Sequence, residues 1–192
     1  MHIWCSEVAA LVGQSLHTTP LKACVTVVKR FLRGTKCSGS AMHGTKYRQD
    51  DDAAKRRRVG CATEQHVYRS VRMCKVPPET SRFECDRGLY HLIGHIDGVY
   101  DSQSIIEIKT RVSGVNRCFD HEYIQMQLYM ECLNKRRCLL VQHMPSKNQN
   151  YLLWVHRNKY VWSDSIEQRL YDMIIRMYIV LYMHALRWCD FL

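Results

Sequence analysis

Hydrophobic and polar residues alternate along two neighbouring segments in the middle of the chain. Residues 83–100 and 105–110 are rich in β-branched and aromatic residues, and the polar run Asp-Ser-Gln-Ser separates them. Such a pattern predicts two strands joined in a β-hairpin. Because successive side chains of a strand point to opposite faces, Glu107 and Lys109 are expected to share one face of the second strand.

The neighbours of Glu107 and Lys109 extend this prediction. Ile106 and Ile108 point to the opposite face of the strand and are expected to lie in a core. Asp97, ten residues before Glu107, is expected on the partner strand, where it would face Glu107 and Lys109. The hairpin is therefore predicted to bring two carboxylates and one amine together at the edge of a sheet.

Helical and strand patterns fill much of the remaining chain. Ser6 is the predicted N-cap of the first helix and Gly13 its stop. Apolar spacing and capping residues predict helices over residues 6–13, 21–32, 55–73, 119–133 and 164–188. Two further strands, joined by a polar turn, are expected over residues 137–143 and 151–156.

The last predicted helix carries a wide apolar face. This face is expected to consist of Ile166, Leu170, Ile174, Met177 and Leu181, widened by Met173, Tyr178 and Tyr182. The order helix, strands, helix, strands, helix predicts an α/β fold with one mixed sheet covered by helices. A length of 192 residues is typical of a single domain with a substantial core.

The net charge indicates what such a fold would bind. The chain carries 28 Lys and Arg against 18 Asp and Glu, which gives a formal net charge of +10. This balance favours a polyanionic partner, nucleic acid first and an anionic membrane surface second. A basic soluble protein without such a partner is the alternative that charge alone leaves open.

The ten cysteines are scattered along the chain and form no C-x-x-C pair, which argues against a zinc site or an iron–sulfur cluster. The first thirteen residues include Glu7 and lack the pattern of a signal peptide. These features predict free thiols in a reducing, intracellular compartment. No apolar run reaches the length of a membrane span, and the closest, residues 173–183, is interrupted by Arg176.

Two carboxylates beside a lysine suit the hydrolysis of phosphodiesters. Hard cations such as Mg²⁺ prefer oxygen ligands and retain water, and a metal-bound water is a stronger nucleophile than free water. Asp97 and Glu107 are therefore candidate metal ligands, together with the carbonyl of Ile108. Lys109 is a candidate to orient or deprotonate the attacking water, or to stabilise developing charge. The alternative is an exposed hairpin with a Glu–Lys pair on the surface.

Two polar residues interrupt predicted inward faces of helices. Glu64 shares a helical face with Val67, and a buried carboxylate is costly without a cation or hydrogen bonds. Its alternative is a position at the edge of the face, paired with Arg69. Gln125 shares a face with Tyr129, so its amide is a candidate to hold water, phosphate or Lys109. The alternative is a core glutamine bonded to the backbone.

Basic residues supply candidate contacts to a nucleic-acid backbone. Residues 55–58 form the run Lys55, Arg56, Arg57 and Arg58. This run is a candidate for phosphate contact or nuclear import, and its alternative is the solvated start of a helix. Arg111 follows the Glu107–Lys109 strand and is a further candidate contact to the DNA backbone.

Taken together, the motifs resemble the PD-(D/E)XK nuclease superfamily, specifically the phage lambda exonuclease-like (YqaJ-type) viral recombinase family. Residues 6–13 are similar to the family's opening helix. Gly60-x-x-x-Glu64 matches the family's helical glutamate motif. Asp97-Gly98 with Glu107-Ile108-Lys109 matches its core D…ExK motif. Tyr123-x-Gln125-x-Gln127 resembles the Q-x-Q helix that follows. The motifs occur in the family's order.

The resemblance implies a restriction-endonuclease-like core, a central mixed sheet flanked by helices, as one domain over residues 1–192. By the same resemblance, Mg²⁺ or Mn²⁺ would be held by Asp97, Glu107, Glu64 and the carbonyl of Ile108. Lys109 would be the catalytic lysine, and Gln125 would organise the site. Ser6 would lie near the 5′-phosphate of the DNA.

The implied function is that of a metal-dependent deoxyribonuclease, a 5′→3′ exonuclease acting on duplex DNA in viral recombination or replication, in the host nucleus or cytoplasm. Its implied partners are DNA, a single-strand annealing protein and further copies of the chain, with no membrane. Two alternatives stay open. One is a RecB- or Cas4-like nuclease or an endonuclease, since Gln125-x-x-x-Tyr129 fits the RecB-type pattern. The other is a non-catalytic nucleic-acid-binding protein on a nuclease fold.

Overall fold

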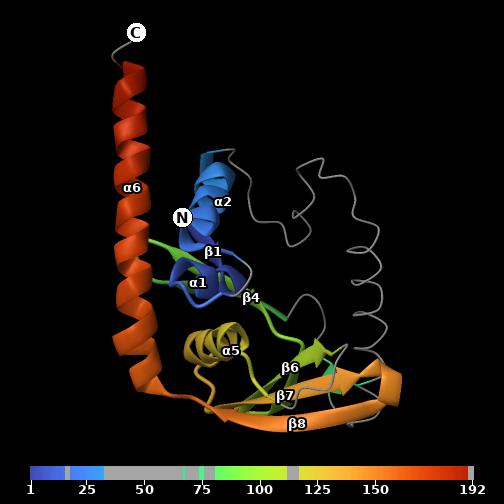
Figure 1. The fold of residues 1–192 in the computed structure, drawn as a ribbon. Helices are drawn as coiled ribbons and strands as arrows, with labels where there is room; N and C mark the ends of the chain where they lie inside the picture. Colours follow the sequence, from blue (N-terminus) through green and yellow to red (C-terminus); the bar gives the residue numbers. More distant parts are fainter. Residues whose placement is uncertain (16–17, 33–66, 68–73, 76–80, 112–116, 190–192) are drawn as a thin grey trace.

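The fold is built on two β-sheets with helices packed between and beside them (Figure 1). The computed structural model describes residues 1–15, 18–32, 67, 74–75, 81–111 and 117–189. The larger sheet has the strand order β2-β5-β6-β7-β8, formed by Cys74–Lys75, Gly98–Asp101, Ser104–Thr110, Arg137–Met144 and Gln149–His156. The smaller sheet has the order β1-β4-β3, formed by His2–Trp4, His91–His95 and Arg82–Asp86.

Both sheets are mixed. In the larger sheet β6 and β7 run parallel while β2–β5, β5–β6 and β7–β8 are antiparallel, and in the smaller sheet β1 runs parallel to β4. The predicted α/β fold and the β5–β6 hairpin are confirmed. The prediction of one sheet is wrong, because the chain bends at Ile96 and Asp97, where β4 leaves the smaller sheet and β5 enters the larger one.

Helix α1 (Cys5–Leu11) follows β1 directly. The prediction that Ser6 caps this helix is wrong, because Trp4 occupies the N-cap position and Ser6 lies in the first turn. The carboxylate of Glu7 accepts the backbone N–H of Trp4 at 3.0 Å, so it supplies the capping bond from the third helical position. Gly13 is confirmed as the stop, since its φ of +79° reverses the chain where few other residues would.

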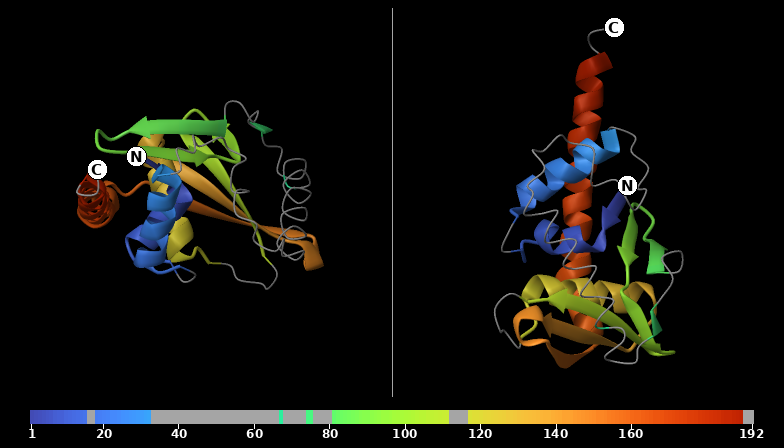
Figure 2. Two further views of the ribbon diagram at one scale, coloured as in Figure 1. Left: turned by 90° about the horizontal axis from the view of Figure 1, so that it is seen from above. Right: turned by 90° about the vertical axis from the view of Figure 1, so that its right-hand side faces the viewer.

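Helix α5 (Asp120–Cys132) lies between the larger sheet and α1, and α2 (Pro20–Leu32) packs on α1 (Figure 2). Both α2 and α5 match their predicted positions. Helix α5 is covered on several sides, so it has buried residues around much of its circumference, polar ones included. Its buried residues include Ile124, Met126, Leu128 and Met130, which share the main core with Ile105, Cys138 and Leu140 of the larger sheet.

The opposite face of the larger sheet carries a second, smaller core. It consists of Val67, Ile106, Ile108, Leu139 and Val141. The predicted helix over residues 55–73 lies outside the described residues except at Val67, which is helical and fully buried as its position in that pattern predicts. Strand β6 therefore has apolar packing on both faces.

The C-terminal helical segment begins earlier than predicted. Helical structure starts at Lys159, continues through the π-helical stretch η2 (Val161–Glu167) and leads into α6 (Gln168–Cys189). The predicted start at Asp164 is wrong, because the side chain of Asn158 caps the segment by accepting the N–H groups of Tyr160 at 3.1 Å and Val161 at 3.4 Å. A 3₁₀ turn, η1 (Pro145–Lys147), joins β7 to β8.

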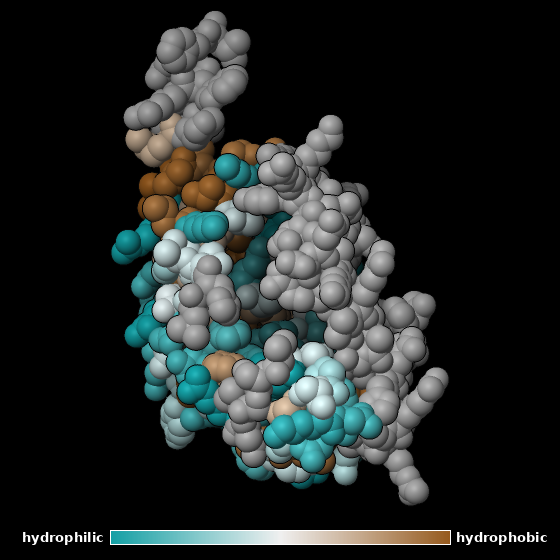
Figure 3. Space-filling model, turned by 45° about the vertical axis from the view of Figure 1, so that its right-hand side comes forward, coloured by the Kyte–Doolittle hydropathy of each residue, from teal (hydrophilic) through white to brown (hydrophobic). Residues whose placement is uncertain are grey.

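Only part of the predicted apolar face of α6 is buried. Ile166, Leu170, Ile174 and Met177 lie in the core, whereas Leu181 is half-buried and Tyr182 is exposed. The helix extends past the sheets (Figure 1), and hydrophobic residues gather on its projecting part (Figure 3). Among the described residues, no helix has both the length and the apolar character needed to cross a membrane.

Candidate active site

Strand β6 presents its charged residues on one face. Glu107 and Lys109 point to the side that carries α5, while Ile106 and Ile108 pack into the second core. This is the alternation predicted from the sequence. The backbone of β6 is paired with β7 from Ser104 to Thr110, so the two charged side chains project from a strand held along its whole length.

Asp97 reaches the same place from a bend rather than from a strand. It was predicted on the partner strand, but β5 begins only at Gly98, which pairs with Ile106. Beyond this pair Ile108 has no β5 residue opposite it, and the Oδ2 atom of Asp97 accepts the backbone N–H of Ile108 at 2.6 Å. The bend therefore anchors one carboxylate beside the backbone that separates Glu107 from Lys109.

Glu107 is a buried carboxylate with only one oxygen satisfied. Its side chain is 4% exposed. Lys109 Nζ donates to Oε1 at 2.5 Å, whereas Oε2 is buried and has no hydrogen-bond partner within the part of the chain that is described. Burial raises the pKa of Glu107 to about 7, with Lys109 opposing the rise and Asp97 adding to it. A buried carboxylate with a raised pKa and an unpartnered oxygen is unfavourable for folding, and such a group marks a candidate functional site.

Helix α5 contributes Gln125 and Tyr129 to the surroundings of Lys109. Lys109 Nζ lies 3.4 Å from Oε1 of Gln125, and Nε2 of Gln125 donates to the hydroxyl of Tyr129 at 2.5 Å. Burial alone would lower the pKa of Lys109, but Glu107 outweighs it and raises that pKa. The ammonium group is thus held between two oxygens from different elements.

Gln127, the second glutamine of the Q-x-Q motif, faces a different part of the fold. It donates to the carbonyl of His156 at 2.8 Å and accepts the N–H of Asn158 at 2.8 Å. These contacts fix the end of β8 to α5, so Gln127 supports the scaffold while Gln125 contacts Lys109.

Arg111 lies next to this group and is held by two residues that the sequence analysis did not single out. Its guanidinium makes two hydrogen bonds of 2.7 Å to Glu122, and its Nε donates to Gln142 at 3.0 Å. Glu122 also accepts the N–H of Phe119 at 3.2 Å. A glutamate at the third position of a helix is a known capping signal that could have identified it. The contact of Arg111 with DNA stays a prediction.

The remaining candidate residues do not join this group in the described structure. Ser6 is exposed in the first turn of α1. Glu64 lies outside the described residues, as does the basic run of Lys55, Arg56, Arg57 and Arg58. Their proposed roles as metal ligand and as DNA contacts are therefore untested by the geometry.

In the described ranges no group of three or more His, Cys, Asp or Glu side chains is placed to hold a metal ion. Two carboxylates and a neighbouring carbonyl nevertheless fit a hard divalent cation. Asp97 and Glu107 supply two carboxylates, and the carbonyl of Ile108 belongs to the residue that follows Glu107 and donates its N–H to Asp97. The buried, unpartnered oxygen of Glu107 is the kind of group that Mg²⁺ satisfies, since this ion binds few protein oxygens and keeps several waters.

Comparison with solved structures identifies the fold. An alkaline exonuclease from Laribacter hongkongensis matches with a TM-score of 0.63 and 14% identity, over 100% of this chain and 95% of that one. The chain has the fold of this exonuclease. The same enzyme in complex with dAMP matches with a TM-score of 0.56 and 15% identity, over 95% of this chain and 93% of that one. A phage-related exonuclease from Haemophilus somnus matches with a TM-score of 0.58 and 16% identity, over 96% of each chain.

The exonuclease fold agrees with the resemblance drawn from the D…ExK motif. No protein-family model matches the sequence, and no curated protein sequence matches it either. At identities of 14–16%, the likeness is one of backbone architecture. The restriction-endonuclease-like fold class predicted from the sequence is thereby confirmed.

Proposed function

We propose that this chain is a metal-dependent deoxyribonuclease, a 5′→3′ exonuclease that hydrolyses phosphodiester bonds of duplex DNA. The observation that carries the proposal is Glu107, which is buried with one oxygen unpartnered among the described residues. A purely structural ion pair would satisfy both of its oxygens, because a buried unsatisfied group costs about 1–3 kcal/mol or more. A carboxylate that must bind a cation keeps an oxygen available.

The proposed metal ligands are Asp97, Glu107 and the carbonyl of Ile108, with Glu64 as a further ligand. When bound, Mg²⁺ or Mn²⁺ would supply Lewis acidity toward the scissile phosphate and lower the pKa of a coordinated water. The bond from Asp97 to the N–H of Ile108 keeps the first carboxylate next to the strand that carries the second. The two ligands are thus fixed before any substrate arrives, which limits reorganisation during the reaction.

Lys109 is proposed to stabilise the negative charge that develops on the phosphate as water attacks. Its ammonium group projects from β6 beside Glu107, and Gln125 contacts it from α5. Gln125 is in turn held by Tyr129. This chain of hydrogen bonds makes Gln125 a positioning residue, because it fixes the direction of Lys109 without being required to touch the substrate.

The test uses linear duplex DNA labelled at each 5′ end and closed circular DNA, each with Mg²⁺, with Mn²⁺ and with EDTA. We expect metal-dependent loss of the linear DNA alone, with early release of the 5′ label. The matched control is Glu107→Gln, which keeps the shape of the side chain and should show no cleavage with either metal. Binding without cleavage by the wild-type protein would contradict the proposal and favour a non-catalytic nucleic-acid-binding protein.

A second candidate is a RecB-like nuclease or an endonuclease. The hydrogen bond from Gln125 to Tyr129 favours it, because this bond joins the two residues of the Q-x-x-x-Y pattern. Nicking of the circular DNA in the same experiment would select an endonuclease over an exonuclease.

The biological setting is proposed from the resemblance alone. The enzyme would act in viral recombination and would supply single strands to an annealing protein. Further copies of the chain would assemble with it. Sedimentation of the purified protein, alone and with a candidate annealing protein, would test both associations.

A further inference from the structure

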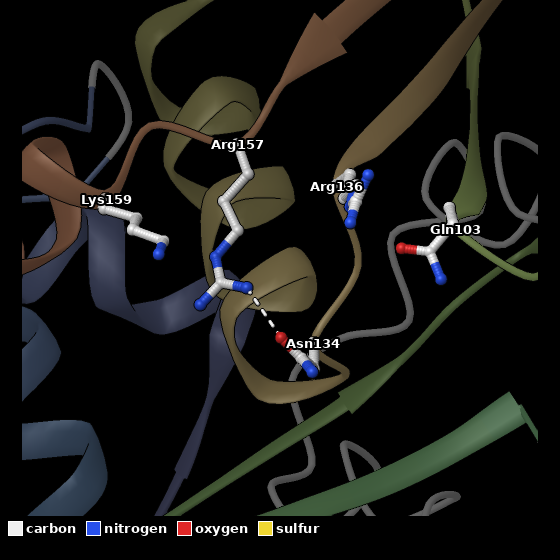
Figure 4. A pocket seen from close by; sticks show the side chains of 5 residues that line it. All are labelled: Gln103, Asn134, Arg136, Arg157 and Lys159. Carbon is white, nitrogen blue, oxygen red and sulfur yellow. Dashed lines mark hydrogen bonds between the residues drawn. The ribbon is translucent and has the colours of Figure 1, made fainter.

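A hollow lies at the end of the larger sheet where β6 and β7 begin and β8 ends. Its volume is about 490 Å³, and it is lined by Gln103, Asn134, Arg136, Arg157 and Lys159 (Figure 4). Gln103 stands in the turn just before β6, and the strand residues from Ser104 to Glu107 alone span roughly 10 Å. We call this hollow the basic hollow, and it is separate from the candidate active site.

The basic hollow carries an excess of positive charge. Three of its five lining residues are cations, and none is an acid. Arg157 is paired with Glu131 at 2.5 Å and donates to Asn134 at 2.9 Å, a contact that is dashed in Figure 4. Arg136 and Lys159 form no salt bridge with any residue that the structure describes, and both are exposed. Their charges are therefore available to an anion.

The backbone around the basic hollow is held by hydrogen bonds between three elements. The carbonyl of Gln103 accepts the N–H of Arg136 at 2.9 Å, and the carbonyl of Arg136 accepts the N–H of Arg157 at 2.9 Å. Asn134 stands at a turn with a φ of +51°, and its side-chain carbonyl orients Arg157. The backbone at Arg136 and the guanidinium of Arg157 are thus arranged in advance, which reduces the ordering cost of binding.

An adjoining hollow adds an aromatic surface. It has a volume of about 850 Å³ and shares Arg157 and Lys159 with the basic hollow. Tyr123 and Tyr160 also line it, and Tyr160 is 76% exposed. Proteins bind single-stranded nucleic acid by combining two features. Positively charged side chains contact the sugar–phosphate backbone, and a neighbouring aromatic ring stacks on a base. A free phosphate would use the cations but not the ring.

We propose that the basic hollow binds the phosphates of single-stranded DNA, through Arg136, Arg157 and Lys159, while a neighbouring base stacks on Tyr160. Duplex DNA fits this combination less well, because its bases are stacked on one another and their faces are covered. The site is a binding site without chemistry of its own. It stands whether or not the carboxylate site cleaves DNA.

Fluorescence anisotropy with a labelled single-stranded oligonucleotide in EDTA tests the proposal without any cleavage. We expect Arg136→Ala combined with Lys159→Ala to weaken binding about tenfold or more, and to reduce the slope of log affinity against log salt by about 1.4, since each phosphate contact on a single strand contributes about 0.7. The matched control is Lys22→Ala combined with Lys29→Ala, which removes two exposed cations from α2 and should leave the slope unchanged.

Tyr160→Ala separates stacking from charge. We expect it to weaken single-strand binding roughly fivefold or more while the salt slope stays the same, because a stacked base contributes no counterion release. Unchanged affinity in the Arg136/Lys159 double variant, or an equal loss with the control pair, would overturn the site. Equal losses for duplex and single strands, or full competition by inorganic phosphate at matched phosphate concentration, would overturn its assignment to single-stranded DNA.

Discussion

The buried ion pair between Arg111 and Glu122 gives a test that does not depend on catalysis. The side chains of Arg111 and Glu122 are only 13% and 3% exposed, and two hydrogen bonds of 2.7 Å join them. Glu122→Gln removes the negative charge while keeping the shape of the side chain. The guanidinium of Arg111 then stays buried without a counter-charge, and breaking a buried pair in this way costs about 3–5 kcal/mol.

For a chain of this size, that loss corresponds to a fall in Tm of roughly 6–20 °C. Thermal and urea unfolding followed by circular dichroism at pH 7 would measure it. The matched control is Glu84→Gln, which disrupts the exposed pair of Arg82 and Glu84, whose side chains are 39% and 38% exposed; here we expect less than about 1 kcal/mol. A loss in Glu122→Gln as small as in this control would refute the argument from burial.

The pH dependence of the free energy of unfolding in acid provides a second test of the Arg111–Glu122 ion pair. Burial alone would raise the pKa of Glu122, but the hydrogen bonds and charge of Arg111 hold it below its ordinary value of 4.5. A lowered pKa in the folded state stabilises the protein above the unfolded-state value, and this stability is lost as the pH falls further. The difference between wild type and Glu122→Gln should therefore be full at neutral pH and shrink below about pH 4.5. A difference that stayed constant through the acid range would contradict the ion pair.

Three further predictions concern the active site and its support. Lys109→Ala should lower the single-turnover cleavage rate by roughly 10²–10⁴ while DNA affinity changes little, and an unchanged rate would remove Lys109 from the chemistry. Mg²⁺ at about a hundred times its dissociation constant should stabilise the wild type by about 2.7 kcal/mol in thermal unfolding, whereas Glu107→Gln should not respond; equal responses would place the metal elsewhere. Gly94→Ala should cost about 2–3 kcal/mol in urea unfolding, because an added Cβ would lie 2.4–2.8 Å from ring atoms of Phe83 and Tyr129, and wild-type stability would show that the rings can move.

The parts of the fold that follow from local periodicity could be predicted from the sequence. Alternation along β6 placed Glu107 and Lys109 opposite Ile106 and Ile108, because a strand fixes side-chain direction at every residue. Helix α5 was predicted within a residue at either end because the run through Cys132 contains no Gly or Pro and only one β-branched residue, Ile124. In both cases the signal lies within the segment itself.

Features that depend on distant segments could not be predicted in this way. The division into two sheets is decided at a bend of two residues, Ile96 and Asp97. Asp97-Gly98 is a turn signal, but it does not reveal that the strands on either side belong to different sheets. The bonds from Arg111 to Glu122 and Gln142 join three separate elements. The start of the last helix was misplaced because Ser163 and Asp164 resemble a cap as well as Asn158 does, and only the observed hydrogen bonds choose between them.

The place of Asp97 in the chain path has a consequence for folding. It stands where the chain passes from the smaller sheet to the larger one, whereas Glu107 belongs entirely to the larger sheet. Asp97 is nevertheless tied to the larger sheet, because it accepts the N–H of Ile108 and its neighbour Gly98 pairs with Ile106. The two carboxylates therefore come together as soon as the larger sheet forms, whereas the contact of Lys109 with Gln125 also requires α5 to pack on that sheet. Under the proposed function, a chain with only the larger sheet formed would hold its metal ligands without a positioned lysine, so full activity would wait until α5 has packed.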